Sequence, residues 1–238
     1  MLPTLPAYIP ATFILTTLAT LLLFYRVIIQ SRAEPVRRRS LLILLALTGW
    51  LLIQAILTWS GIYVPTATPE PPKLVLFGIL PTVLLIAFLF ATAAGRRFVD
   101  SLPLTGLTYL NVVRIPVELV LFWLFVHKTI PELMTFEGRN FDIISGITAP
   151  FVAYGLAKGW LSRSLLLFWN VLCLGLLFTI VRYALLSAPT PLQQYAFDQP
   201  NIAIAYFPFS WLPTFIVPIV LFGHLVSIRQ LLFKPSAE

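Results

Sequence analysis

Seven long apolar stretches limit what this chain can fold into. A bilayer core of about 30 Å is crossed by a helix of roughly 20 apolar residues, and seven stretches come close to that length: 8–29, 41–60, 74–95, 104–127, 142–158, 165–186 and 208–231. The fifth is the shortest. The sequence therefore predicts an all-α integral membrane protein, a seven-transmembrane-helix bundle in which residues 1–238 form a single multi-pass domain.

Composition excludes a soluble protein. Hydrophobic residues make up 59% of the chain and charged residues 11%, whereas an average globular domain has about 25% charged residues. The net charge of +7 does not indicate a nucleic-acid-binding protein, because the basic residues lie at the ends of apolar stretches rather than in one patch. The surrounding partner is therefore expected to be the lipid bilayer.

The positions of the basic residues predict the orientation. In a seven-span arrangement, eleven of the 16 basic residues fall on one side, and an excess of Lys and Arg marks the cytoplasmic side. The N-terminus is thus expected outside and the C-terminus in the cytoplasm. No basic residue precedes the first apolar stretch, so it reads as a retained span rather than a cleaved signal peptide. We expect an integral protein of a bacterial plasma (inner) membrane.

Charged residues interrupt the fourth stretch. Arg114 and Glu118 are four residues apart, so a helix places them on one face, with Asn111 about one turn earlier. One charged residue at the centre of a span costs about 2.5–3.5 kcal/mol of insertion free energy. The two are expected to neutralise each other and face the bundle interior. Pro116 lies between them and frees the carbonyl of Val112.

Other spans contain polar residues at a similar depth. Asn170 and His224 lie in the same half as Arg114, and Gln54 lies nearer the midplane. Taken singly, each is explained by an interhelical hydrogen bond, and His224 by a bond to a carbonyl freed by Pro213 or Pro218. Together they predict a polar cavity open to the cytoplasm. Its substrate-binding residues are expected to be Asn111, Arg114, Glu118, Asn170, His224 and Gln54.

A second charged segment, KTIPELMTFEGRNFD (128–142), follows the fourth stretch. It is expected to be an outer loop with a tight turn at Gly138. Its residues, or the residue just before it, form a candidate gate or outer mouth: His127, Glu132, Glu137, Arg139 and Asp142. Their spacing matches no metal-ligand pattern, and we predict no metal and no cofactor.

Several functions remain open. The first is the binding or translocation of a small polar or anionic solute, possibly proton-coupled through Glu118. The second is a membrane-embedded enzyme acting on a lipid or isoprenoid head group, and the third is a structural or sensory subunit, which a tightly packed centre would favour. The chain contains no Walker A, GxSxG or HExxH motif, so no catalytic residue is assigned. The sequence determines neither the solute nor the oligomeric state.

Overall fold

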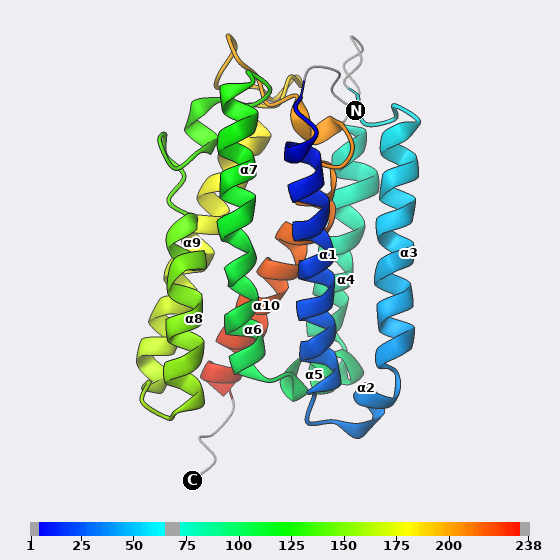
Figure 1. Ribbon diagram of the computed structural model, residues 1–238. Helices are drawn as coiled ribbons and strands as arrows, with labels where there is room; N and C mark the ends of the chain where they lie inside the picture. Colours follow the sequence, from blue (N-terminus) through cyan, green and yellow to red (C-terminus); the bar gives the residue numbers. More distant parts are fainter. Residues whose placement is uncertain (1–4, 65–71, 234–238) are drawn as a thin grey trace.

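The structure is a computed structural model that describes residues 5–64 and 72–233, and within those residues it contains helices and no strand. Figure 1 shows the helices as a bundle of long, nearly parallel rods. We call the end where α1 begins the upper end and the end with α2 and α5 the lower end. The helices are α1 (Tyr8–Ile29), α2 (Glu34–Arg38), α3 (Ser40–Trp59), η1 (Val75–Ile79), α4 (Leu80–Ala91), α5 (Ala93–Ser101), α6 (Leu104–Leu110), η2 (Asn111–Val113), α7 (Arg114–Val126), η3 (Glu132–Met134), α8 (Ile143–Ala157), α9 (Arg163–Leu186), η4 (Ala203–Ala205), η5 (Leu212–Ile216) and α10 (Val217–Phe233).

Within residues 5–64 and 72–233, five helical stretches are long and apolar enough to cross a membrane: Tyr8–Ile29, Ser40–Trp59, Leu104–Val126, Arg163–Leu186 and Leu212–Phe233. The bent pair Val75–Ala91 and Ala93–Ser101 adds a sixth if it counts as one span, and Ile143–Ala157 is a shorter apolar helix. The part of the chain that the structure describes is therefore all-helical with five candidate membrane-spanning helices, as expected of a multi-pass membrane protein.

Apolar side chains cover the outside of the bundle, while polar ones are buried within it. Leu52 and Ile56 on α3 and Phe88 on α4 are about 60% exposed. Helix α10 runs through the centre, because 67% of its most apolar window is buried, compared with 22% for α3. This distribution suits a lipid environment, in which polar groups must find partners inside the protein.

The stretch predicted to span 74–95 ends earlier than expected. Helix α4 stops at Ala91, and α5 departs at an angle of 95°. Thr92 adopts an extended conformation and caps α5, since its side chain accepts a hydrogen bond from the backbone N–H of Gly95. A Cβ atom at position 95 would lie 2.2 Å from the carbonyl oxygen of Leu89, so this close turn requires glycine.

The predicted 142–158 span is a short helix. Helix α8 has 15 residues, which corresponds to about 22 Å at 1.5 Å per residue. It starts beside the first residue of α7, near the middle of the Leu104–Val126 stretch, because Asp142, the residue before it, contacts Arg114. The preceding segment therefore descends into the bundle from the upper end (Figure 1). It is not simply the outer loop that the sequence suggested.

The prolines near the start of α10 explain how this helix is held. The helix begins at Leu212 as the π-helical turn η5, not at Pro208. Pro218 has no N–H, so it leaves the carbonyl of Thr214 without its helical partner. The indole N–H of Trp50 donates to that carbonyl over 2.9 Å. The expectation that His224 takes a carbonyl freed by Pro213 or Pro218 is therefore not met.

Candidate functional site

A buried ion pair forms the centre of the site. Nη1 of Arg114 lies 2.7 Å from Oδ1 of Asp142, and both side chains are almost completely buried. The same nitrogen lies 3.4 Å from the carbonyl of Cys173 on α9. The spacing of four residues instead predicts that Arg114 pairs with Glu118. The structure corrects this assignment, because the descending segment brings Asp142 into direct contact with the guanidinium.

His224 connects this ion pair to α9. Nη2 of Arg114 lies 3.2 Å from Nε2 of His224, and Nδ1 of His224 lies 3.0 Å from Oδ1 of Asn170. A guanidinium can only donate, so Nε2 accepts and the proton of the neutral imidazole is on Nδ1. That N–H donates to Asn170, whose amide nitrogen donates to the carbonyl of Leu166. Three helices thus share one continuous hydrogen-bond chain.

Glu118 has a different partner. Its Oε1 accepts a hydrogen bond of 2.6 Å from Nδ2 of Asn140, which also donates to the carbonyl of Met134. Oδ1 of Asn140 accepts from the backbone N–H of Asp142. Asn140 therefore holds both the carboxyl group of Glu118 and the start of α8. We call Arg114, Glu118, Asn140, Asp142, Asn170 and His224 the buried polar cluster.

Local sequence features place this cluster. The 3₁₀ turn η2 precedes Arg114, within the stretch where Pro116 interrupts the helical hydrogen bonding. Gly146 on α8 allows a close approach to α7, because a Cβ atom there would lie 3.0 Å from the backbone nitrogen of Ile115. These features bring the start of α8 against the start of α7.

Two other predicted substrate-binding residues, Asn111 and Gln54, form hydrogen bonds with residues outside the cluster. The amide nitrogen of Asn111 donates to carbonyls of its own helix, at Leu107 and Thr108. Gln54 on α3 donates to the carbonyl of Phe77 and accepts from the hydroxyl of Tyr63. Gln54 therefore joins α3 to η1 and to the turn after α3.

The candidate gate residues separate into two groups. Glu132, Glu137 and Arg139 are exposed, and Nδ1 of His127 lies 2.8 Å from the carbonyl of Trp123. Asp142, predicted at the same outer mouth, is instead buried in the cluster. Among the described residues, no group of three or more His, Cys, Asp or Glu side chains is placed to hold a metal ion.

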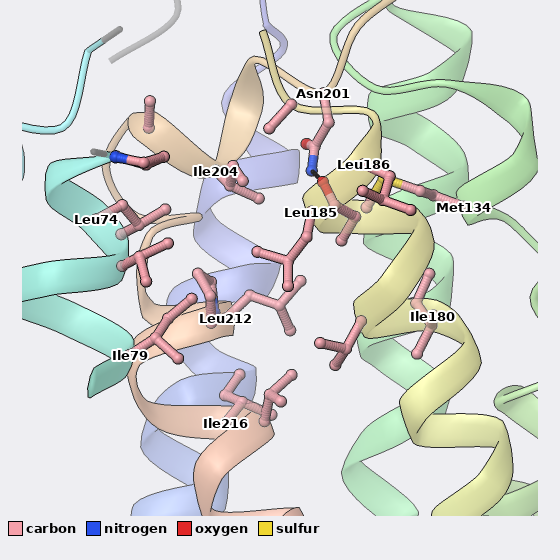
Figure 2. A pocket seen from close by; sticks show the side chains of 18 of the residues that line it. Leu74, Ile79, Met134, Ile180, Leu185, Leu186, Asn201, Ile204, Leu212 and Ile216 are labelled. Carbon is pink, nitrogen blue, oxygen red and sulfur yellow. Dashed lines mark hydrogen bonds between the residues drawn. The ribbon is translucent and has the colours of Figure 1, made fainter. Parts of the chain in front are cut away.

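A cavity of about 520 Å³ lies above the cluster, between α4, α9 and α10. In Figure 2, Leu74 and Ile79 line one wall, Ile180 and Leu185 line the opposite wall, and Leu212 lies between them. The cavity is lined mainly by apolar side chains, with polar ones gathered at its ends. Arg114, Glu118 and Asp142 lie at the lower end, and Tyr63, Lys73, Thr190 and Asn201 lie at the upper end. The expected polar cavity opening toward the lower, basic end is therefore replaced by an apolar cavity toward the upper end.

The cavity also opens sideways. Three of its lining residues are well exposed on the apolar outer surface: Val83 on α4 is 42% exposed, and Phe178 and Leu185 on α9 are 56% and 40% exposed. A smaller apolar pocket between α4 and α10 shares Val83 and Leu221 with the main cavity. The opening between α4 and α9 therefore faces the region where lipid chains would lie.

Tyr63 at the upper end gives a prediction about pH. Burial raises the pKa of its phenol from the ordinary 10.0 to about 12, although the hydrogen bond to Gln54 opposes this shift. The stabilising effect of the neutral phenol is present below pH 10 and is lost as pH rises toward 12. The stability difference between wild type and Tyr63→Phe should therefore stay constant up to about pH 10 and shrink above it. Denaturant unfolding at several pH values, with an ultraviolet tyrosine titration of both proteins, measures this; a phenol at position 63 that ionises near pH 10 would contradict it.

Comparison with models of protein families identifies the family of this chain. Residues 71–232, about two-thirds of the chain, match the family described as Domain of unknown function (DUF8737). The chain belongs to this family. The chain matches no curated protein and no solved structure. The DUF8737 region contains the whole buried polar cluster and almost all of the cavity lining, whereas α1, α3 and Gln54 lie before it.

Asn140 is a member of the cluster that the sequence does not predict, and Asp142 is predicted at the outer mouth rather than in the cluster. One signal pointed to both: EGRNFD is a polar run in a chain with few charges, and it directly precedes a short apolar stretch. A span too short to cross the bilayer implies that the residues before it can lie at membrane depth. Asp142, the last residue of this run, could therefore lie at membrane depth.

Proposed function

We propose that this DUF8737 protein binds a membrane-resident amphiphile with a single apolar chain, which enters the cavity sideways between α4 and α9. The observation that carries the proposal is the cavity itself, apolar along its length and polar at its ends. Its volume of about 520 Å³ lies in the range typical of small-ligand sites. An apolar wall gives no compensation for the lost hydration of a small polar solute, so the structure favours a lipid-like ligand over solute translocation.

The proposal includes the topology predicted from the sequence. In a seven-span arrangement, α8 and the η1–α4 stretch join the five long helices. The described basic residues support an outside N-terminus, because ten of them belong to segments of the lower end: Arg26, Arg32, Arg37, Arg38, Arg39, Arg96, Arg97, Lys158, Arg163 and Arg229. Lys234, the eleventh, lies outside the described residues. The cavity then opens toward the outer leaflet of the plasma membrane.

The buried polar cluster also supports a structural role for part of the predicted site. Asn170, His224 and Arg114 are bonded directly to one another, without a gap between them. They fix the contacts between α7, α9 and α10. This is the role that such residues would have in a structural subunit. No observation gives comparable support to an enzymatic role.

A cavity-filling substitution tests the proposal. Val181 lines the cavity on α9, whereas Val171 on the same helix faces outward and is 54% exposed. Val181→Phe should reduce binding of a radiolabelled 16-carbon alkyl probe at least ten-fold, a change of about 1.4 kcal/mol. Val171→Phe is the matched control and should bind like wild type. The measurement is saturable probe binding to purified protein in lipid nanodiscs; equal binding by all three proteins would overturn the proposal.

A further inference from the structure

The lower end of the cavity has a charge balance that restricts its ligand. It contains one cation, Arg114, and two carboxyl groups, Asp142 and Glu118. Asp142 already pairs with Arg114 over 2.7 Å. An added anion would therefore face at least one carboxylate and a guanidinium that is already paired. An added cation would lie close to that guanidinium. An added anion leaves a net negative charge in a buried apolar site whether or not Glu118 is ionised, which is costly. An added cation leaves a net positive charge when Glu118 is protonated, and it cannot accept a hydrogen bond from Arg114 in either state.

Two buried polar atoms of this end are unused. Nε of Arg114 and Oε2 of Glu118 have no hydrogen-bond partner among the described residues. Glu118 is only 1% exposed, and both Arg114 and Glu118 line the cavity. Buried polar groups are normally paired. The lower end of the cavity therefore has a guanidinium N–H donor and one carboxyl oxygen that the described residues leave without a partner, on two side chains that line the cavity.

A hydroxyl group is complementary to this pair. It accepts from Nε–H of Arg114, and it donates to Oε2 if Glu118 is a carboxylate or accepts from it if Glu118 is protonated. A hydroxyl therefore satisfies both atoms in either state of Glu118, and it adds no charge. A carboxylate, an ammonium or an alkane each fails one of these conditions.

The geometry points to a long-chain alcohol as the ligand, with its hydroxyl between Arg114 and Glu118 and its chain along α9 and α10. This inference rests on the proposed function and adds the chemical class of the polar group. The length of the cavity can be estimated along α9. Arg114 contacts the carbonyl of Cys173 near the lower end, and Asn201 contacts the carbonyl of Ala184 near the upper end. Eleven residues separate these levels, which corresponds to about 16 Å.

The test compares ligands that share one chain and differ in the end group. Binding of radiolabelled 1-hexadecanol to the wild-type protein in nanodiscs is competed at pH 7 with hexadecanoate, hexadecylamine and hexadecane. Hexadecanol should bind about ten-fold more tightly than each of the three, as expected for two hydrogen bonds that only the hydroxyl completes without added charge. Equal or tighter binding of hexadecanoate or hexadecylamine would overturn the inference about the end group while the proposed function stands.

A variant distinguishes the contribution of the hydroxyl group to binding from that of the alkyl chain. Glu118→Leu should weaken hexadecanol about ten-fold and leave hexadecane unchanged, because only the alcohol uses Oε2. An unchanged affinity for hexadecanol in a folded variant would overturn the inference. If this variant does not fold, the wild-type series still decides. If no chain binds, or if Val181→Phe changes nothing, the proposed function itself fails, which is a different result from a wrong end group.

Discussion

Replacement of Arg114 by Met lowers the free energy of unfolding by about 3–5 kcal/mol, the usual cost of removing one partner of a buried ion pair. Asp142 would remain buried without its cation, and His224 would lose the donor to its Nε2. Met is chosen because its unbranched chain fills much of the same space. The measurement is reversible denaturant unfolding of the purified protein in detergent micelles.

The interpretation has two controls. Arg139→Met changes an exposed arginine and should stay within about 0.5 kcal/mol of wild type. The double variant Arg114→Met/Asp142→Leu should be more stable than Arg114→Met alone, because it removes the stranded carboxylate. If the double variant is as unstable as the sum of its single changes, the two residues are not coupled and the pair is not what holds α8 against α7.

Fold class was predictable because it depends on local properties. The lengths of apolar stretches and the positions of charges fix where helices begin and end, and each predicted stretch contains an observed helix within a few residues. The departures arise where backbone chemistry interrupts an apolar stretch. The bend at Thr92 ends α4 early, and the prolines around Trp211 delay the last helix. Whether α8 and the η1–α4 stretch cross the bilayer remains a prediction.

The site was only partly predictable. Arg114, Asn170 and His224 are predictable because polar side chains inside apolar helices require polar partners. In the structure, His224 forms hydrogen bonds with both Arg114 and Asn170. The partner of Arg114 was missed, because helical spacing relates residues of one helix and gives no information about a segment 28 residues away. Residues 128–142 enter the bundle because of tertiary contacts such as Asp142–Arg114 and Asn140–Glu118, which local sequence patterns do not reveal.

The apolar cavity could not have been predicted from the sequence. Ile180 on α9 and Ile216 on η5 are buried apolar residues that line it, and they are indistinguishable in sequence from core residues such as Leu166. A cavity results from side chains that fail to meet, which depends on the relative positions of α4, α9 and α10. Polar residues inside apolar stretches are visible in the sequence, and for this reason the sequence predicts a polar site.

Replacement of Gly138 by Ala tests whether the descending segment positions the site. A Cβ atom at position 138 would lie 2.3 Å from the carbonyl oxygen of Glu132 and 2.7 Å from Cα of Leu133. Backbone atoms cannot rotate away as a side chain does, so the segment itself must shift. The expected loss of unfolding free energy is about 1–3 kcal/mol, the range for added volume in packed sites.

The same substitution should also weaken ligand binding, because Asn140 and Asp142 lie two and four residues after Gly138 and hold Glu118 and Arg114. Gly175→Ala is the matched control, since a Cβ atom there meets nothing within 4 Å. It should keep wild-type binding and gain a little stability, because alanine favours the helix more than glycine does. A Gly138→Ala protein with normal stability and normal hexadecanol binding would show that the segment tolerates displacement. The cluster would then owe its geometry to the packing of α7, α9 and α10 alone.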